Sequence, residues 1–353
     1  MTAAGVLATE FTATSTYTSS QYLLVLYSFV VAAFALFATG LYSLRSSGDI
    51  SKAYRPATTV STLICWVAAL AYVVLVLEWV LGFTPSADGA TYTPDPGTVI
   101  TELRYMDWSV TVPMLTVEIL GVAALTRAQA FRLRTIAVPA AFLMIVTGYL
   151  GVVHGADART GTTAALWVWG AISTVFFVVL YWVAYTAYKR TAPQVSAEAR
   201  TSYRNALVLL FSVFGAYPLA YLVPAFAGAD DGTWGATEQI VLTAADIAAK
   251  AGFGLLIHKV AKLRTAEDAR AAGGTTDEDL APTVPDTVPA QVWISGTLIS
   301  LPPLHGDQTV RTAHAATTTR GTGTGTREGT PARDGARDGA RDGARTSGGR
   351  SRR

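Results

Sequence analysis

Seven stretches of about 20 or more mainly apolar residues follow one another along the chain, and each is long enough to cross a bilayer as an α-helix. They cover residues 22–44, 58–82, 99–125, 132–153, 163–188, 203–227 and 236–261. The third and the seventh stretches are the least uniformly apolar. The pattern predicts an all-α membrane protein: a seven-transmembrane-helix bundle that passes repeatedly through the plasma membrane, with the lipid bilayer as its partner.

The connections between these stretches alternate in charge, and the alternation predicts an orientation. Those after the first, third, fifth and seventh stretches are rich in Lys and Arg, whereas the others carry Asp. The basic set includes Arg45, Lys52, Arg55, Arg127, Arg132, Arg134, Lys189, Arg190, Lys262 and Arg264; the acidic set includes Asp88, Asp95, Asp157, Asp230 and Asp231. Because basic connections stay in the cytoplasm, we expect the N-terminus outside and the C-terminus inside.

The segments that flank the bundle differ from it in composition. Residues 1–21 are rich in Thr, Ser and Ala and lack the basic start of a signal peptide, so we expect an extracellular segment. Thr84–Thr98 combines Pro and Gly with alternating Thr and Tyr, which predicts a small external hairpin. Residues 22–264 form the predicted membrane domain. Residues 265–353 are of low complexity and repeat Ala-Arg-Asp-Gly over Ala336–Arg345, which predicts a disordered cytoplasmic tail.

Composition excludes several functional classes. Of the 353 residues, 51% are hydrophobic and only 15% are charged, whereas soluble domains carry about 25% charged residues. The one cysteine, Cys65, excludes a disulfide framework, and no pair among the four histidines has metal-ligand spacing. The net charge of +2 gives no indication of a nucleic-acid partner.

Ionisable residues inside two of the predicted spans are candidates for a functional site, because charge within a bilayer is costly. In the seventh stretch, Asp246 and Lys250 are four residues apart and therefore share a helix face. In the third stretch, Asp107, Thr111 and Glu118 fall within roughly 40° of one another at about 100° per residue. We expect both sets to face the interior of the bundle.

Arg104 completes this group, since it lies about 60° from the same line on the third stretch. Together with Lys250, Asp107 and Asp246 it sums to zero charge, which makes a buried cluster tolerable. A buried lysine is also the residue that forms Schiff bases with carbonyl compounds. Two plainer alternatives stay open: an ion pair that only fixes helix packing, and a Glu118 side chain that reaches the membrane interface.

Longer motifs around these residues resemble those of the microbial rhodopsins. Arg104–Trp108 is similar to their third-helix signature, and Asp246–Gly254 is similar to their seventh-helix retinal attachment motif. Ala216–Pro218, followed by Tyr221, is similar to their sixth-helix motif. The resemblance covers about residues 20–264, and its pattern is nearest to the eubacterial proton pumps of the proteorhodopsin and xanthorhodopsin kind.

The resemblance implies a cofactor and a set of proton-carrying residues. Lys250 would bind all-trans retinal as a protonated Schiff base, with Asp107 as primary counterion and proton acceptor. Asp246 would be the second counterion, Arg104 an outward relay and Glu118 the cytoplasmic proton donor.

Further residues are assigned by the same resemblance. Thr111 would hydrogen-bond the acceptor carboxyl, Ser61 would hydrogen-bond the donor, and Glu238 is a candidate for proton release. The other implied retinal-binding residues are Tyr72, Trp108, Leu115, Met144, Gly148, Ser173, Thr174, Phe214, Tyr217, Pro218 and Tyr221. Gly170 would open a window for a carotenoid antenna, although a glycine there can also serve helix packing.

The function implied is a light-driven outward proton pump, which is an ion transporter and not an enzyme, present as a homo-oligomer. Asp107 argues against a chloride pump, and Thr111 with Glu118 argues against a sodium pump. A sensory rhodopsin that signals through a partner stays open as an alternative, with Glu118 favouring the pump. A seven-helix transporter without retinal is a more remote alternative.

Overall fold

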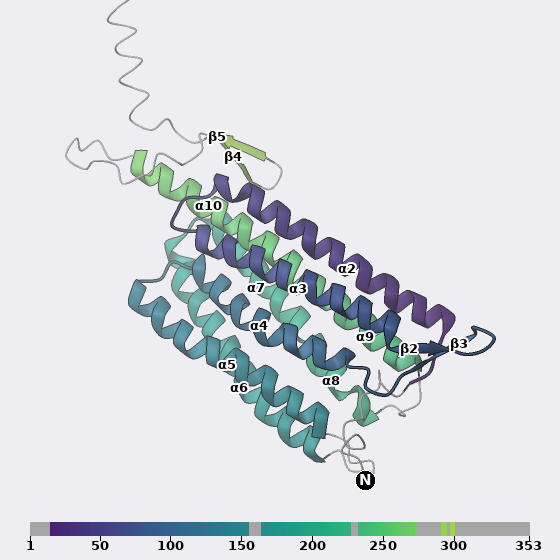
Figure 1. Ribbon diagram of the computed structural model, residues 1–353. Coiled ribbons are helices and arrows are strands. Elements are labelled where there is room, and N and C mark those ends of the chain that lie inside the picture. Colours follow the sequence, from purple (N-terminus) through teal and green to yellow (C-terminus); the bar gives the residue numbers. More distant parts are fainter. Residues whose placement is uncertain (1–14, 155–163, 227–231, 274–290, 295–296, 301–353) are drawn as a thin grey trace, which may run out of the picture. The chain divides into compact units, whose positions relative to one another are not determined.

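The computed structural model describes residues 15–154, 164–226, 232–273, 291–294 and 297–300. Within the first three ranges, long helices lie side by side in a bundle (Figure 1). They are α2 (Ser19–Ser46), α3 (Arg55–Leu81), α4 (Ile100–Gly121), α5 (Arg127–His154), α6 (Ala164–Thr191), α7 (Ala197–Phe214), α8 (Ala216–Phe226), α9 (Gly232–Asp246) and α10 (Phe253–Gly273), with short 3-10 turns η2 (Ser47–Asp49) and η3 (Ala192–Gln194). Consecutive helices from α2 to α6 pack against each other, and α10 packs against α7 and α3. The predicted seven-helix bundle is confirmed, with two of the seven spans divided into two helices.

The sixth and seventh spans are each interrupted near their middle. Helix α7 ends at Phe214 and is capped by Gly215, shortly before Pro218, which lacks the N–H that would bond to the carbonyl of residue 214. Helices α9 and α10 are joined by a π-helical turn, η4 (Ile247–Gly252), which contains Lys250. Such turns are rare and frequently occur at functional sites.

The composition of the helices matches a membrane environment, with one instructive exception. Among the described residues, six helical segments are long and apolar enough to cross a membrane, and α4 is not one of them. Helix α4 carries Arg104, Asp107 and Glu118, whose exposed fractions are only 1%, 6% and 0%. The third span is therefore less apolar because its charges face the bundle and not the lipid.

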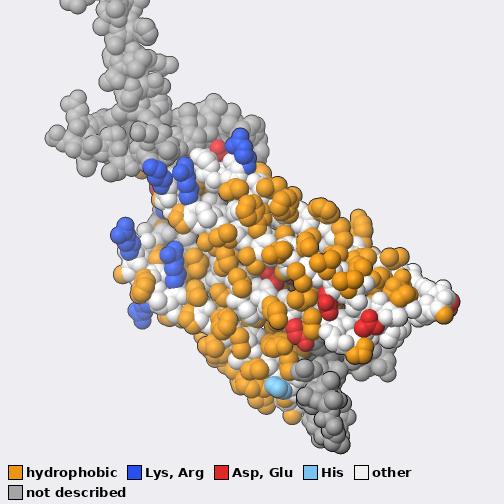
Figure 2. Space-filling view, in the orientation of Figure 1, with side chains coloured by type: hydrophobic (Ala, Val, Ile, Leu, Met, Phe, Trp, Pro, Cys, Tyr) orange, Lys and Arg blue, Asp and Glu red, His pale blue; other side chains and the backbone are white. Residues whose placement is uncertain are grey.

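The surface of the bundle separates apolar from charged side chains (Figure 2). Apolar side chains cover the flank, where large residues such as Leu23, Tyr27, Phe34, Phe131 and Leu219 are exposed. Lys and Arg side chains gather at one end, which we call the basic end. The ends of α2 and α6 and the starts of α3 and α5 lie there (Figure 1), with the exposed residues Arg45, Lys52, Arg127, Lys189 and Arg190 on or next to them. The charge pattern predicts that this end is cytoplasmic; we call the opposite end, with Asp88 and Asp95, the acidic end.

A small antiparallel sheet lies at the acidic end of the bundle. Its strands, in the order β1-β3-β2, are β1 (Tyr17–Thr18), β3 (Thr91–Pro94) and β2 (Phe83–Pro85). The hairpin predicted within Thr84–Thr98 is confirmed, and Gly89 in its turn has a φ of +67°, which glycine adopts readily. The sequence did not indicate that Tyr17 would pair with Tyr92 and add β1 as a third strand.

The tail predicted from residue 265 begins later in the structure. Helix α10 continues to Gly273, because Ala266 and Ala269 are buried against Val195 and Ala199 near the start of α7. Burial raises the pKa of Tyr54 to about 12, so its hydroxyl stays protonated and donates to Asp268 of this extension at 2.8 Å.

Two further strands lie within the predicted tail. They are β4 (Gln291–Ile294) and β5 (Thr297–Ser300), and they pair antiparallel. Disorder over the whole of residues 265–353 is therefore wrong for these segments. The remainder of the tail, including the Ala336–Arg345 repeat, lies outside the described residues.

Candidate functional site

Lys250 lies in the centre of the bundle and contacts both predicted counterions. Its Nζ is 2.6 Å from Oδ2 of Asp107 on α4 and 2.9 Å from Oδ1 of Asp246 at the end of α9. At most 3% of each of these side chains is exposed. The predicted cluster is formed, and one cation is held between two carboxylates in a site closed to solvent.

The two carboxylates differ in how many donors hold them. Oδ1 of Asp246 accepts from Nε1 of Trp108 at 3.1 Å and from the hydroxyl of Tyr217 at 2.8 Å. Its Oδ2 accepts from the hydroxyl of Tyr72 at 2.9 Å and lies 3.5 Å from Nη1 of Arg104. Hydrogen bonds to a carboxylate stabilise its charged form, so Asp246 is strongly held as an anion.

Asp107 is held by Lys250 alone among the hydrogen bonds of the described residues. Its second oxygen, Oδ1, is buried without a hydrogen-bond partner there. The bond predicted from Thr111 to this carboxyl is not formed, because the Thr111 hydroxyl donates to the backbone carbonyl of Asp107, one turn back, at 3.0 Å. Of the two carboxylates, Asp107 therefore has the free acceptor capacity.

Arg104 is fixed by residues that the sequence analysis did not single out. Its Nε donates to Oε1 of Gln239 at 2.8 Å, and its Nη2 donates to Oγ1 of Thr243 at 3.0 Å. The ring of Phe29 lies 5.2 Å from the guanidinium carbon. The sequence did contain a signal for Gln239 and Thr243. They precede Asp246 by seven and three residues, so all three lie on one helix face.

Glu118 lies on α4 about 16 Å along the helix from Asp107, toward the basic end. Its side chain is fully buried. Neither carboxyl oxygen has a hydrogen bond of ordinary geometry among the described residues, although Ser61 of α3 is close enough to interact. Gly254 of α10 leaves the room for both side chains, because a Cβ there would overlap Ser61 Oγ and lie 3.8 Å from Glu118 Oε1.

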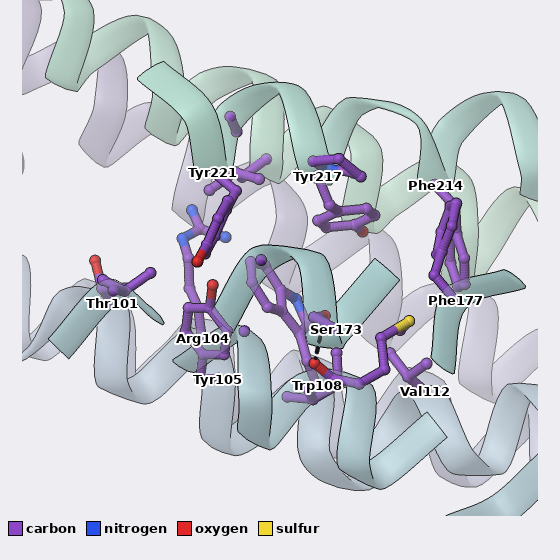
Figure 3. A pocket seen from close by; sticks show the side chains of 18 of the residues that line it. Thr101, Arg104, Tyr105, Trp108, Val112, Ser173, Phe177, Phe214, Tyr217 and Tyr221 are labelled. Carbon is purple, nitrogen blue, oxygen red and sulfur yellow. Dashed lines mark hydrogen bonds between the residues drawn. The ribbon is translucent and has the colours of Figure 1, made fainter. Parts of the chain in front are cut away.

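A cavity of about 300 Å³ adjoins this cluster on the side of α5, α6 and α8. Figure 3 shows Tyr217 and Tyr221 of α8 facing Trp108 and Tyr105 of α4 across it. Of the predicted retinal-binding residues, those that line it are Trp108, Met144, Gly148, Gly170, Ser173, Thr174, Phe214, Tyr217, Pro218 and Tyr221. Arg104 and Glu238 line it as well.

Other predicted residues lie outside the cavity wall. Tyr72 belongs to the hydrogen bonds of Asp246, and Leu115 lines a separate hollow of about 20 Å³ that shares Val112 and Phe214 with the main cavity. Lys250 does not line the cavity either. Its carboxylate partner Asp246 accepts hydrogen bonds from two of the lining residues, so the amine lies just behind the wall.

The chemistry of this cavity fits retinal. Its wall is mainly aromatic and aliphatic, which suits a long apolar polyene. The amine needed for a covalent link to an aldehyde lies at one side, and the two carboxylates beside it would neutralise the resulting cation.

The space beside Gly170 is smaller than the sequence implies. A Cβ on Gly170 would lie 2.9 Å from Cε1 of Tyr221, and one on Gly151 would overlap the Tyr221 hydroxyl. That hydroxyl donates to the carbonyl of Leu166 at 2.7 Å. The two glycines therefore accommodate the Tyr221 ring, which occupies the slot beside Gly170 where the resemblance implies a carotenoid window.

The comparison with protein families decides the relationship of this chain. Residues 24–263 match the family model described as bacteriorhodopsin-like protein. The chain belongs to the bacteriorhodopsin-like family. It is accordingly a microbial rhodopsin, as its motifs predict, and an integral membrane protein of a family that binds retinal.

Individual relatives with low sequence identity to this chain support its membership of the family. Archaerhodopsin-2 of Halobacterium sp. (strain aus-2) is 28% identical over 228 residues, which cover 63% of this chain and 79% of that protein. The green-light absorbing proteorhodopsin of Gamma-proteobacterium EBAC31A08 is 24% identical over 237 residues, which cover 66% and 85%.

Among solved structures, xanthorhodopsin, described as a light-driven ion pump with dual chromophore, is 31% identical with a TM-score of 0.65. The match covers 72% of this chain and 98% of that one. The family is one of light-driven ion-transporting rhodopsins.

Proposed function

We propose that this protein is a light-driven outward proton pump that carries all-trans retinal on Lys250. Bound as a protonated Schiff base, retinal would supply the light-driven change of shape at the Lys250 nitrogen. The observation that carries the proposal is that Asp107 contacts Lys250, while Glu118 lies fully buried on the same helix, about 16 Å further toward the basic end.

Asp107 is the proton acceptor in this proposal. Its Oδ2 lies 2.6 Å from Lys250 Nζ, and its Oδ1 has no hydrogen-bond partner among the described residues. Transfer of the Lys250 proton to Asp107 neutralises both groups, and the charge of Asp246 then remains balanced by Arg104. Asp246, held by several donors, keeps its charge throughout and acts as the second counterion.

Glu118 is the proton donor that restores the proton on the Lys250 nitrogen. It lies toward the basic end in an environment where a neutral carboxylic acid is favoured over a carboxylate. If the basic end is cytoplasmic, as its charge predicts, a proton taken up there and released at the acidic end moves outward. Arg104 and Glu238, which line the cavity, lie between Asp107 and the acidic end. Arg104 would respond to the loss of charge on Asp107, and Glu238 would release a proton at the acidic end.

Light-driven acidification of the medium tests the proposal. Cells or vesicles of known orientation that contain the protein with added retinal should become coloured and acidify the outside in light, and a protonophore should abolish the signal. Lys250→Ala should remove both colour and pumping, since the amine is lost. Alkalinisation, or a visible pigment in Lys250→Ala, would contradict the proposal.

A sensory rhodopsin is the second candidate, and Glu118 discriminates between the two. A sensor needs no buried donor carboxyl at the basic end, whereas a pump needs rapid return of the proton. A photocycle without net proton movement in sealed vesicles would favour the sensor.

A carotenoid antenna at Gly170 also stays a proposal. Xanthorhodopsin is described as having a dual chromophore, and Gly170 lies at the cavity edge beside Tyr221. Because the Tyr221 ring fills the slot, a carotenoid ring would require this side chain to turn away. Added keto-carotenoid should give an induced circular dichroism band that Gly170→Trp abolishes while retinal binding persists; no band in the unmodified protein would make Gly170 a packing residue.

A further inference from the structure

His258 is a buried titratable side chain near the basic end that has no part in the mechanism above. It lies on α10 two turns beyond Lys250, and only 3% of it is exposed. Its ring contacts that of Tyr42 on α2, with 5.8 Å between centroids. A histidine inside a membrane bundle is costly unless its polar atoms are used, so its hydrogen bonds bear on its function.

The hydrogen bonds of Ser46 define which ring nitrogen carries the proton. Ser46 Oγ lies 2.9 Å from Nε2 of His258 and donates to the backbone carbonyl of Tyr42 at 2.7 Å. A hydroxyl has one proton, so a Ser46 that donates to the carbonyl must accept from Nε2–H. The neutral ring then has no proton on Nδ1. This nitrogen is buried without a hydrogen-bond partner among the described residues, and it is a vacant proton acceptor.

One face of α10 connects this nitrogen with the donor carboxyl in one direction and with solvent in the other. Gly254, where a Cβ would lie 3.8 Å from Glu118 Oε1, is one turn before His258. Lys262 is one turn after it and contacts Asp49, with Nζ 3.0 Å from Oδ2. Successive positions are four residues, or about 6 Å, apart along the helix, and they share a face. The side chain of Asp49 is 47% exposed, so this row of residues reaches the protein surface at Asp49.

We propose that His258 is the proton-uptake residue that resupplies Glu118, an inference that rests on the proposed pump function. A proton from solution at the basic end binds Nδ1 and makes the ring an imidazolium. The same proton then passes through water to the Glu118 carboxylate, which becomes neutral, and the ring returns to its neutral form. One proton enters and one leaves the ring in each cycle.

The charged groups around the ring affect the stability of its imidazolium form. Lys262 on α10 and burial both disfavour it, whereas Asp49 of η2 favours it. Tyr42 on α2 is the other titratable side chain against the ring. A relay that stayed charged would hold its proton, so a ring that rests neutral suits transfer to Glu118.

The resting state of the ring is testable without light. We expect solid-state ¹⁵N NMR of the protein in lipid to show His258 at pH 7 as the neutral tautomer protonated on Nε2. Ser46→Ala should remove this preference, since the acceptor for Nε2–H is lost. A ring that is protonated on Nδ1 or doubly protonated in the dark would overturn the inference.

The uptake step is tested with His258→Gln, whose amide can still donate to Ser46 but cannot carry an added proton. Its absorption and the loss of the proton from Lys250 should be unchanged. Proton uptake from the medium, followed with a pH-sensitive dye after a flash, should slow by roughly tenfold or more, and imidazole added to the buffer should restore it. Lys259→Gln, which removes a charge from the adjacent residue, is the control and should behave as the unmodified protein.

The outcomes separate the inference from the pump itself. If the unmodified protein pumps and His258→Gln takes up protons at the same rate, the inference is wrong and the pump stands. If the unmodified protein moves no protons in light, the proposed function fails first. Should His258→Gln yield no pigment, the tautomer measurement on the unmodified protein still decides.

Discussion

Around Lys250 every buried charge lies within 3.5 Å of an opposite one, whereas Glu118, on the same helix as Asp107, has no ion pair among the described residues. The first site comprises one lysine, one arginine and two aspartates, with zero net charge; we call it the ion cluster. The second is a single carboxyl group. Both are almost closed to solvent.

The difference determines which protonation state each site stabilises. Removal of one partner from a buried ion pair leaves a bare charge, so the ion cluster is most stable when its charges are matched. A lone buried carboxyl is instead stable when neutral, because no partner offsets the cost of its charge. In the proposed function, Asp107 accordingly rests as a carboxylate and Glu118 rests protonated, which are the starting states that a proton acceptor and a proton donor require.

The ion cluster contains a second contrast, between Asp246 and Asp107. Asp246 accepts from Trp108, Tyr217, Tyr72 and Lys250, whereas Asp107 accepts from Lys250. This difference agrees with the proposed roles, in which Asp246 keeps its charge and Asp107 accepts the proton.

The largest effect is expected when the ion cluster loses a charge. Asp107→Asn should leave a folded, coloured protein, because Lys250 still has Asp246 as a counterion. Its absorption should shift to the red, because one negative charge beside the cation is lost. Pumping should fall by at least about 100-fold without the acceptor. Absorption spectra and light-driven pH changes in vesicles measure both effects.

Asp246→Asn is the matched comparison for that variant. It disturbs the hydrogen bonds of Tyr72, Trp108 and Tyr217 at once. Breaking a buried pair costs about 3–5 kcal/mol, and this variant breaks two such pairs, with Lys250 and Arg104, whereas Asp107→Asn breaks one. The yield of folded pigment and its thermal stability should therefore fall much further than in Asp107→Asn. Equal stability of the two variants would contradict the contrast between the carboxylates.

A smaller and later effect is expected at Glu118. Glu118→Gln is nearly isosteric and removes no ion pair, so colour and thermal stability should change little. Return of the proton to the Lys250 nitrogen should slow by about 100-fold, because the donor is lost. Flash absorption measures the decay of the deprotonated pigment, and decay at the unmodified rate would exclude Glu118 as the donor.

The sequence predicted the fold and the centre of the site because both depend on local patterns. Stretches of apolar residues determine the spans, and helical spacing alone brings Asp246 beside Lys250. The pairing of Lys250 with Asp107 required one further assumption, that both faces point inward, which the cost of charge in lipid justifies.

What the sequence could not predict depends on side chains from distant segments. The Thr111 hydroxyl donates to the backbone carbonyl of Asp107, one turn back, and not to the carboxylate that the resemblance implies. Whether the slot at Gly170 is open depends on Tyr221, about 50 positions later in the chain, whose ring occupies it. The extension of α10 past residue 264 depends on its packing against the start of α7.

The smallest effect we predict sharpens the contrast at the donor without touching a charge. In Gly254→Ala the new Cβ would overlap Ser61 Oγ, so the Ser61 hydroxyl must rotate away and Glu118 loses its polar neighbour. The lost contact is weaker than a full hydrogen bond, which contributes about 0.5–1.5 kcal/mol, so return of the proton from Glu118 should change by no more than roughly tenfold. Gly252→Ala on the same span is the control, because its Cβ would meet only Cδ2 of Leu209 at 3.5 Å, an ordinary contact.

Flash absorption compares the two variants. Two signals report the ion cluster: the absorption maximum and the rate of proton loss from Lys250. Both signals should be the same in the two variants. If Gly254→Ala shifted the absorption maximum as strongly as Asp107→Asn, the donor and the ion cluster would be one coupled site, and the contrast between a paired and an isolated charge would not hold.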